Sequence, residues 1–302
     1  MRSNRIVRLA EIAFEYIENY CYHFLKKINH GGARKVSVDE FGNTKVSLLR
    51  KSLLGERHQE IVVSADSVLL YNVQRYGVYE KSLISLFRRY MKEGSFGATF
   101  VDIGANCGLI SLGVANNNSK ISRVIAIEPI PQNSAALEMN FRRANLKYLI
   151  LNYGLSTDST KNEIFVPTNQ FGSATLIPRE GSGQRIRVDL ASPSQFYREE
   201  LADKKNLYIK CDIEGKDIEV LANFPSEAWK NVIAVSFEIS RVQLEQISEV
   251  IDLLITLKSA GLEYFYLESR FPRIISIEEI KLLTLDSTRN NWNIFVCRDR
   301  SN

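Results

Sequence analysis

The chain has 302 residues, which is enough for one large domain with an added segment. Hydrophobic residues make up 45% and charged residues 25%, so the composition is that of a globular protein and excludes an intrinsically disordered chain. The net charge of +4 is concentrated in residues 1–58, which hold eleven Lys/Arg against six Asp/Glu. The nearly neutral remainder argues against a nucleic-acid partner, because phosphate binding usually requires a dense basic surface.

The cysteines are scattered along the sequence without C-x-x-C spacing, so we predict neither a disulfide framework nor a zinc site. No apolar run is long enough to span a membrane, and no segment is typical of a secretory signal. We therefore expect a cytoplasmic protein.

Residues 6–28 carry apolar side chains at steps of three and four, which is the spacing of one helix face. Such a helix can pack on its own domain, join two copies in a homo-oligomer or make a peripheral membrane contact. The acidic residues Glu11, Glu15 and Glu18 dilute its basic face and weaken the membrane alternative.

A β-rich segment follows this helix. Residues 35–39 and 44–49 are predicted to form two strands around a turn, and residues 61–64 and 68–71 are predicted to be further strands. We assign residues 1–58 to an N-terminal extension made of the amphipathic helix and the β-hairpin.

From residue 96 onward, short apolar runs alternate with helical stretches, which indicates βαβ units and a mostly parallel sheet. Seven strands are predicted, at Thr99–Ile103, Val124–Ile127, Tyr148–Asn152, Leu207–Cys211, Ile233–Phe237, Tyr264–Leu267 and Ile294–Cys297. Helices are predicted at Leu109–Ala115, Gln132–Ala144, Pro193–Leu201, Lys216–Ala222 and Arg241–Ser259, the last ending near Gly261. Residues 59–302 are assigned to one domain, with a two-stranded insertion at residues 162–190.

A glycine-rich turn follows the first of these strands, in the segment Phe100-Val-Asp-Ile-Gly-Ala-Asn-Cys-Gly-Leu-Ile-Ser111. Gly104 and Gly108 would let the backbone approach a ligand, and the helix N-terminus would present N–H groups to a ligand carboxylate. Asp102, at the strand end, could meet a ligand ammonium. Asn106 stands where a dinucleotide motif needs glycine, which disfavours a nicotinamide oxidoreductase.

A second acid, Glu128, ends the next predicted strand and could accept hydrogen bonds from both hydroxyls of a ribose. The third strand ends in Leu151-Asn-Tyr-Gly-Leu-Ser156, where Asn152 or Ser156 could hydrogen-bond an adenine ring. Ordinary loop chemistry explains that last segment equally well.

These motifs, together with Ile209-Lys-Cys-Asp-Ile-Glu-Gly215 and Phe237-Glu238, resemble the FkbM family of S-adenosylmethionine-dependent methyltransferases. The segments Gly77-Val-Tyr-Glu80 and Gly172-Ser-Ala-Thr-Leu176 are also similar to family features. The resemblance implies a class I methyltransferase (Rossmann-like) α/β fold with a seven-stranded, mostly parallel sheet and helices on both faces. It implies S-adenosylmethionine as the cofactor, bound by residues that include Glu80, Asp102, Gly104, Asn106, Gly108 and Glu128.

Methyl transfer to a hydroxyl requires a base, and all three histidines lie in residues 1–58, so carboxylates are the candidates. Asp212 and Glu214 follow the fourth strand with a spacing that points both side chains to one face, and Glu238 closes the fifth strand. We predict Asp212 or Glu214 as the base and Glu238 as a substrate-orienting residue; helix capping is the alternative for the first two. A divalent cation between Asp212 and Glu238 is possible but not favoured.

The sequence therefore favours an O-methyltransferase that acts on a hydroxyl of a sugar, a glycan or another polyhydroxylated small molecule. Methylation of nitrogen, of a protein or of a nucleic acid remains an alternative. So does a non-catalytic interaction module that keeps the fold.

Overall fold

The computed structural model describes residues 33–38, 44–48, 60–63, 67–92, 94–158, 162–167, 174–176, 183–245, 247–267, 273–283 and 290–299. The predicted helix at residues 6–28 lies outside these residues, so its proposed roles remain predictions.

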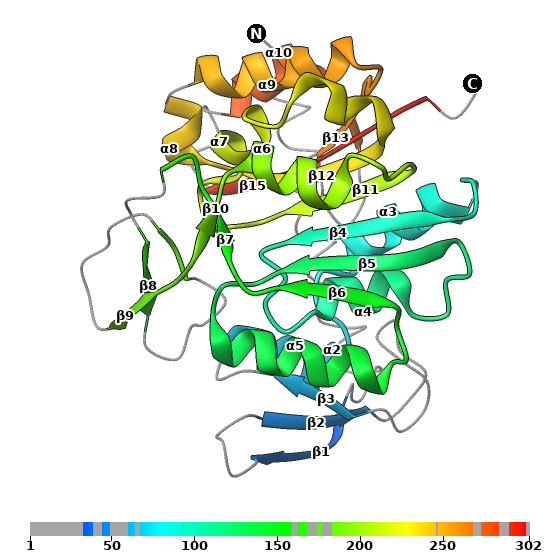
Figure 1. Ribbon diagram of the computed structural model, residues 1–302, viewed down its shortest axis with the longest axis vertical. Helices are drawn as coiled ribbons and strands as arrows, with labels where there is room; N and C mark the ends of the chain where they lie inside the picture. The colour runs from blue at the N-terminus through cyan, green and yellow to red at the C-terminus, as the bar shows by residue number, and fades with distance from the viewer. Residues whose placement is uncertain are drawn as a thin grey trace, which may run out of the picture.

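A central sheet of eight strands organises the described part of the chain, in the order β14-β13-β15-β12-β11-β4-β5-β6 (Figure 1). In chain order the strands are β4 (Ala98–Ile103), β5 (Ile121–Ile127), β6 (Tyr148–Leu151), β11 (Leu207–Cys211), β12 (Val232–Ser240), β13 (Tyr264–Leu267), β14 (Arg273–Ile275) and β15 (Asn291–Cys297). The strands from β6 to β12 pair in parallel, whereas β15, β13 and β14 pair antiparallel. All seven predicted strands are confirmed, and β14 is an additional edge strand whose three residues are too few to show a pattern.

The helices in the described residues are α2 (Ser67–Tyr76), α3 (Lys81–Lys92), α4 (Leu109–Ala115), α5 (Pro131–Arg143), α6 (Pro193–Phe196), α7 (Asp217–Ala222), α8 (Arg241–Glu245), α9 (Ile247–Ser259) and α10 (Ile277–Leu282), with a π-helical turn η2 (Tyr197–Leu201) and a 3₁₀ turn η3 (Ser226–Asn231). The helix predicted at 193–201 is thus α6 followed by a π-helical turn, and the helix predicted at 241–259 is described as α8 and α9. Gly261 follows α9 with a φ of 87°, as expected of a helix-ending glycine.

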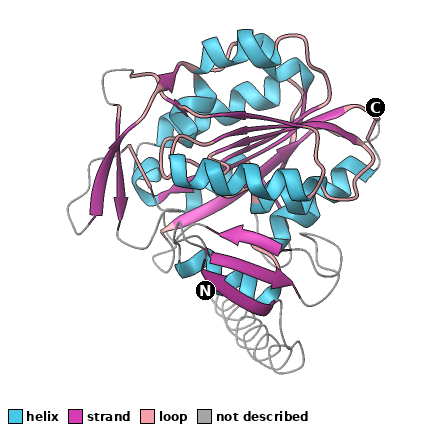
Figure 2. Ribbon diagram, turned by 60° about the horizontal axis from the view of Figure 1, so that its bottom comes forward, coloured by secondary structure: helices cyan, strands magenta, loops and turns pink. Residues whose placement is uncertain are grey.

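Helices cover both faces of the central sheet, which Figure 2 shows nearly edge-on. Phe100 of β4 packs in the core on the side of α3, α4 and α5, while its neighbours Val101 and Ile103 pack in the core that contains α7 and α9. Burial on both faces explains why β4 is apolar along its length, apart from Thr99 and Asp102, and does not alternate with polar residues.

The residues before the main sheet form a second, antiparallel sheet in the order β1-β2-β3, from β1 (Ala33–Val38), β2 (Thr44–Leu48) and β3 (Glu60–Val63). The predicted hairpin is confirmed. Strand β3 follows the predicted division at residue 58 yet pairs with β2, and the domain boundary stays a prediction.

The strand predicted at residues 68–71 is wrong, because these residues lie in helix α2. Leu69 and Val73, four residues apart, are both buried against the core, which is a helical spacing that outweighs the local run of apolar residues.

A buried side-chain amide attaches the N-terminal sheet to the main domain. Asn140 of α5 accepts a hydrogen bond from the backbone N–H of Val62 at 2.8 Å and donates to the Val62 carbonyl at 2.8 Å. Its amide also donates to the carbonyl of Cys107 at 2.7 Å. Strand β3 is therefore connected, through one side chain, to the loop between β4 and α4.

The insertion forms an antiparallel hairpin of β8 (Glu163–Pro167) and β9 (Gly183–Arg187), as predicted. It lies at the side of the molecule toward which β4, β5 and β6 point (Figure 1). A short parallel pair, β7 (Gly154–Leu155) with β10 (Leu190–Ala191), connects it to the end of β6. Among the described residues, no helix has the length and apolar character needed to cross a membrane.

Candidate active site

A pocket opens at the carboxyl ends of β4, β5 and β11, where open α/β sheets bind their ligands. Its walls come from the β4–α4 loop, the end of β5, strand β7, the loop after β11, the insertion and the segment around α2. The lining residues used below are Leu69, Tyr79, Gly104, Asn106, Glu128, Ile130, Leu155, Ile164, Ala174, Leu176, Lys210, Asp212 and Glu214.

The β4–α4 loop passes through three left-handed residues. Gly104, Asn106 and Gly108 have φ angles of 75°, 52° and 81°. Asparagine tolerates this conformation better than most side chains, and glycine adopts it freely. The turn directs the backbone N–H of Asn106 to the carboxylate of Glu128, 2.8 Å away.

Packing within the protein leaves no room for a side chain at the two glycines of this loop, and the ligand approach predicted for them stays a prediction. A Cβ at Gly104 would lie 2.0 Å from the carbonyl oxygen of Asp212, and one at Gly108 would lie 2.5 Å from the side chain of Leu137. Gly104 lines the pocket, while Gly108 sets the start of α4 against α5.

Glu128 lies at the end of β5 as predicted, is 4% exposed and lines the pocket. Its Oε2 accepts from the N–H of Asn106, and its Oε1 accepts from the N–H of Ile130 at 2.9 Å and from the Asn133 amide at 3.3 Å. A carboxylate offers about four acceptor sites, so about one remains for a ligand hydroxyl rather than the two predicted. Burial raises the pKa of Glu128 to about 7, although these hydrogen bonds and Lys210 oppose the shift.

Asp102 is fully buried and does not line the pocket; its predicted contact with a ligand ammonium stays a prediction. Its Oδ2 accepts a hydrogen bond from the hydroxyl of Ser111 at 2.6 Å, and its Oδ1 lies 3.3 Å from Nζ of Lys210. Glu80, which is also predicted to bind the cofactor, is half-buried and has a φ of 45°. Its negative charge helps to raise the pKa of Lys210. Glu80 is not a lining residue either, whereas its neighbour Tyr79 is.

Asn152 and Ser156 do not line the pocket, and their predicted contact with adenine stays a prediction. Asn152 is exposed and accepts a hydrogen bond from the hydroxyl of Ser134 on α5. The hydroxyl of Ser156 is used in its own turn, where it accepts from the N–H of Asp158 at 3.1 Å. The residues of this segment that do reach the pocket are Gly154 and Leu155.

The loop after β11 brings the predicted catalytic acids to one place. Asp212 and Glu214 line the pocket. Glu238, on β12, does not. Burial raises the pKa of Glu238 to about 8, and the negative charges of Asp212, Asp217 and Glu214 add to the shift. Glu238 is therefore near enough to the other acids for their negative charge to raise its pKa, although its side chain is not part of the pocket wall.

Asp217, the first residue of α7, belongs to this acidic cluster and was not identified from the sequence. It is fully buried; its two oxygens accept hydrogen bonds from the N–H of Ile213 at 3.4 Å and of Glu238 at 3.3 Å. Burial, followed by the charge of Asp212, raises its pKa to about 7. An acid at the first turn of a helix is a common capping pattern, which is the signal that could have indicated it.

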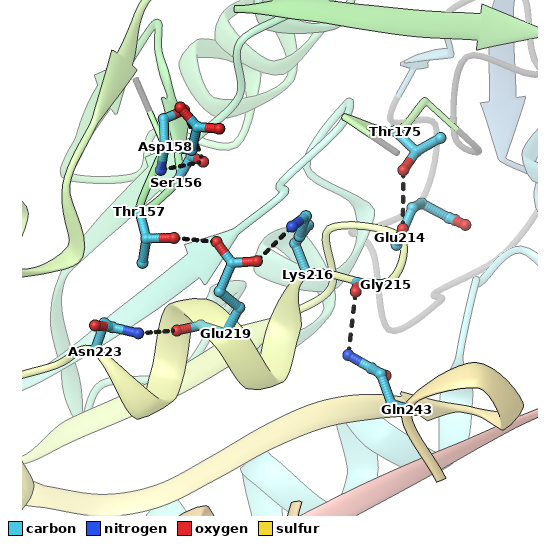
Figure 3. A network of polar contacts seen from close by, with 10 residues as sticks. All are labelled: Ser156, Thr157, Asp158, Thr175, Glu214, Gly215, Lys216, Glu219, Asn223 and Gln243. Carbon is cyan, nitrogen blue, oxygen red and sulfur yellow. Dashed lines mark hydrogen bonds and ion pairs between the residues drawn. The ribbon is translucent and has the colours of Figure 1, made fainter. Parts of the chain in front are cut away.

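Polar contacts hold the Asp212–Lys216 loop from three sides (Figure 3). The hydroxyl of Thr175, in the insertion, donates to the carbonyl of Glu214 at 3.0 Å, and the amide of Gln243 on α8 donates to the carbonyl of Gly215 at 3.1 Å. Lys216 pairs with Glu219, which also accepts from the hydroxyl of Thr157. The loop conformation therefore depends on the insertion as well as on α7 and α8.

No group of three or more His, Cys, Asp or Glu side chains within the described residues is arranged to hold a metal ion. The acids near the pocket are instead held by backbone N–H groups and by Lys210.

The site fits S-adenosylmethionine in its chemistry. Glu128 presents an acceptor suited to a ribose hydroxyl, and Ile130 and Leu155 provide apolar walls suited to an aromatic base. Together with the strand order and the antiparallel strand β15 between β12 and β13, these features define a class I methyltransferase.

The chain belongs to the FkbM methyltransferase family, since the Methyltransferase FkbM domain matches residues 102–264, more than half of its length. It is therefore an S-adenosylmethionine-dependent methyltransferase of the FkbM type.

Three other methyltransferases are similar to this chain in sequence or in structure. The chain is 28% identical over 186 residues to methyltransferase sdnD of Sordaria araneosa, covering 49% of this chain and 71% of that protein. Among solved structures, an SAM-dependent O-methyltransferase of Thermotoga maritima has a TM-score of 0.41 at 13% identity, with 88% of this chain and 78% of that chain covered. A methyltransferase FkbM of Methylobacillus flagellatus has a TM-score of 0.39 at 20% identity, with 67% and 44% covered.

Proposed function

We propose that this protein transfers a methyl group to a hydroxyl of a sugar, a glycan or another polyhydroxylated small molecule. The observation that supports this proposal is the pair of carboxylates, Asp212 and Glu214, at the pocket wall together with Glu128. A hydroxyl nucleophile must lose its proton, and a carboxylate at the pocket wall can accept it. The nearly neutral main part of the chain supports a small-molecule or glycan acceptor over a nucleic acid.

Asp212 is the proposed base, because it lines the pocket and 32% of its side chain is exposed, so it is accessible to an acceptor hydroxyl. When bound, S-adenosylmethionine supplies the methyl group and a sulfur leaving group. Asp212 would accept the proton that the acceptor hydroxyl loses on becoming the nucleophile. Alignment of the reacting atoms supplies much of the rate.

Glu214 and Glu238 have supporting roles in this proposal. Glu214 lines the pocket and contributes an acceptor for other hydroxyls of the substrate. Glu238 does not line the pocket. Burial, with the charges of Asp212, Asp217 and Glu214, raises its pKa to about 8, so its neutral form predominates at neutral pH and it adds little negative charge near the base. Its predicted role in orienting the substrate stays a prediction.

The test incubates the purified protein with methyl-labelled S-adenosylmethionine and three acceptor panels: polyols and oligosaccharides, amines and peptides, and RNA. We expect label only in the hydroxyl panel. Asp212→Asn is expected to lower turnover by roughly 10²–10⁴-fold. Its affinity for S-adenosylhomocysteine, measured by calorimetry, should stay close to that of the wild type.

Glu138→Gln is the matched control, because Glu138 is an exposed acid on α5 away from the pocket. Its turnover should be unchanged. Label found in amines or RNA instead of hydroxyls would reject the acceptor class. Full turnover in Asp212→Asn would reject the assigned base.

A further inference from the structure

Lys210 is a buried cation at the carboxyl end of β11. Its side chain is 5% exposed, and lysine is almost never buried to this extent unless it is paired. In the sheet it stands directly beside Asp102 of the neighbouring strand β4. Its ammonium group is thus placed between two strand ends whose loops both line the pocket.

Three oxygens surround the Lys210 ammonium. Nζ donates to the carbonyl of Gly104 at 2.8 Å, and lies 3.3 Å from Oδ1 of Asp102 and 3.5 Å from Oδ2 of Asp212. Burial acts to lower the pKa of Lys210, but Asp102, Asp212 and Glu80 together raise it above its ordinary value. The two neighbouring carboxylates therefore favour the charged form of this side chain.

Asp102 obtains its partners from within the protein. Ser111 donates to one of its oxygens, and the other has no donor in the described part of the chain apart from the Lys210 ammonium. Because Asp102 is fully buried and lies outside the pocket wall, a ligand ammonium would have to displace Lys210 to reach it.

We propose that Lys210 is the charge partner of Asp102, in place of the cofactor's ammonium, and that Lys210 is a positioning residue which joins the Gly104 loop to the Asp212 loop. This inference rests on the proposed function for its catalytic part, because Asp212 is the base there. Its structural part, the pairing with Asp102, depends only on the observed contacts.

Four variants test the pairing: Lys210→Met, Asp102→Asn, the double variant and Lys210→Arg. Lys210→Met leaves buried Asp102 without its ammonium partner, and we expect the Tm to fall by roughly 10 °C. Asp102→Asn leaves Lys210 paired with Asp212 alone, and the Tm should fall by a smaller amount. The double variant removes both charges and should recover most of this loss. Lys210→Arg keeps the cation and should retain more stability than Lys210→Met.

Binding of S-adenosylhomocysteine, measured by calorimetry, decides whether Asp102 touches the cofactor. If Lys210 is its partner, the double variant should bind about tenfold more tightly than Asp102→Asn alone, because it no longer buries an ammonium that has lost its pairing with Asp102. Glu128→Gln should lose affinity without a comparable loss of Tm. A double variant that recovers its Tm but binds as weakly as Asp102→Asn would show that Asp102 contacts the cofactor, and would overturn the proposal that Lys210 takes the place of the cofactor's ammonium.

Measurement of kcat tells whether Lys210 positions the two loops or only balances the charge of Asp102. The double variant still lacks the ammonium that holds Gly104 and Asp212, so its kcat should remain about tenfold or more below the wild type even where affinity recovers. A wild-type kcat in the double variant would reject the positioning role. A wild-type protein that binds S-adenosylhomocysteine but methylates no hydroxyl would reject the proposed function, while the stability and affinity measurements would still decide the pairing.

Discussion

Gly104 shows how one residue serves the fold and the site together. Its φ of 75° favours glycine, and a Cβ there would lie 2.0 Å from the carbonyl oxygen of Asp212. Its own carbonyl accepts from Lys210, and its N–H donates to the carbonyl of Ile127 at 3.0 Å. The position therefore brings the cofactor loop against the loop of the proposed base with no room for a side chain.

We predict that Gly104→Ala lowers stability by roughly 3 kcal/mol or more, because backbone strain and a steric clash add together. Gly97→Ala is a matched control: its φ is 84°, but nothing lies within 4 Å of the added Cβ. The control should lose only about 1–2 kcal/mol. Urea unfolding of both variants measures the difference, and equal losses would show that the clash is relieved by a backbone shift.

At the scale of elements, the insertion is connected to the catalytic loop through a buried hydroxyl. Thr175 is 1% exposed, pairs by its backbone with Phe165 of β8, and donates from its side chain to the carbonyl of Glu214. Glu214 has a φ of 56°, a conformation that needs support from its surroundings. The insertion therefore helps to maintain the loop that carries Asp212 and Glu214.

Replacing Thr175 by valine or by serine separates this hydrogen bond from packing. Thr175→Val keeps the shape and removes the donor, so we expect turnover to fall about tenfold with the Tm lowered only slightly. Thr175→Ser keeps the donor and removes a buried methyl group, which should cost about 1 kcal/mol of stability while turnover is largely kept. Steady-state kinetics and thermal unfolding check both, and the same turnover in the two variants would contradict the role of the hydroxyl.

For the whole molecule, three carboxyl groups near the pocket make stability depend on pH. Burial is the first cause that raises the pKa of Glu128 and Asp217 to about 7 and that of Glu238 to about 8. In the unfolded chain these groups ionise near pH 4. Between these values the folded state binds more protons than the unfolded state, so stability falls as the pH rises from about 4 to about 8.

We therefore predict a lower Tm at pH 8.5 than at pH 6 for the ligand-free protein. Glu238→Gln removes one of these titrating groups, so the Tm of the variant should fall less between pH 6 and pH 8.5 than that of the wild type, by about 5 °C. The exposed Glu138→Gln variant should follow the wild-type curve. Scanning calorimetry at both pH values gives the result, and a Glu238→Gln curve parallel to the wild type would contradict the shifted pKa.

Much of this fold follows from local sequence patterns. Continuous apolar runs identify the buried strands, and each run ends where a polar residue such as Glu128 or Asp212 begins the loop. Because parallel strands end at one edge of the sheet, the gathering of these acids at a single pocket also follows from the sequence. The short run at residues 68–71 was misassigned, since four apolar residues do not distinguish a buried strand from a buried helix turn.

The sequence by itself determined the class of fold, the family resemblance and the acids at the strand ends. Only the tertiary structure decided the partners of the polar residues at these strand ends: Lys210 for Asp102, backbone N–H groups for Glu128, and Ser134 for Asn152. The physical reason is that periodicity sets which face of a strand a residue occupies, whereas its neighbour depends on sheet order and register. Lys210 and Gly104 are 106 positions apart in the chain and meet only because β11 lies beside β4.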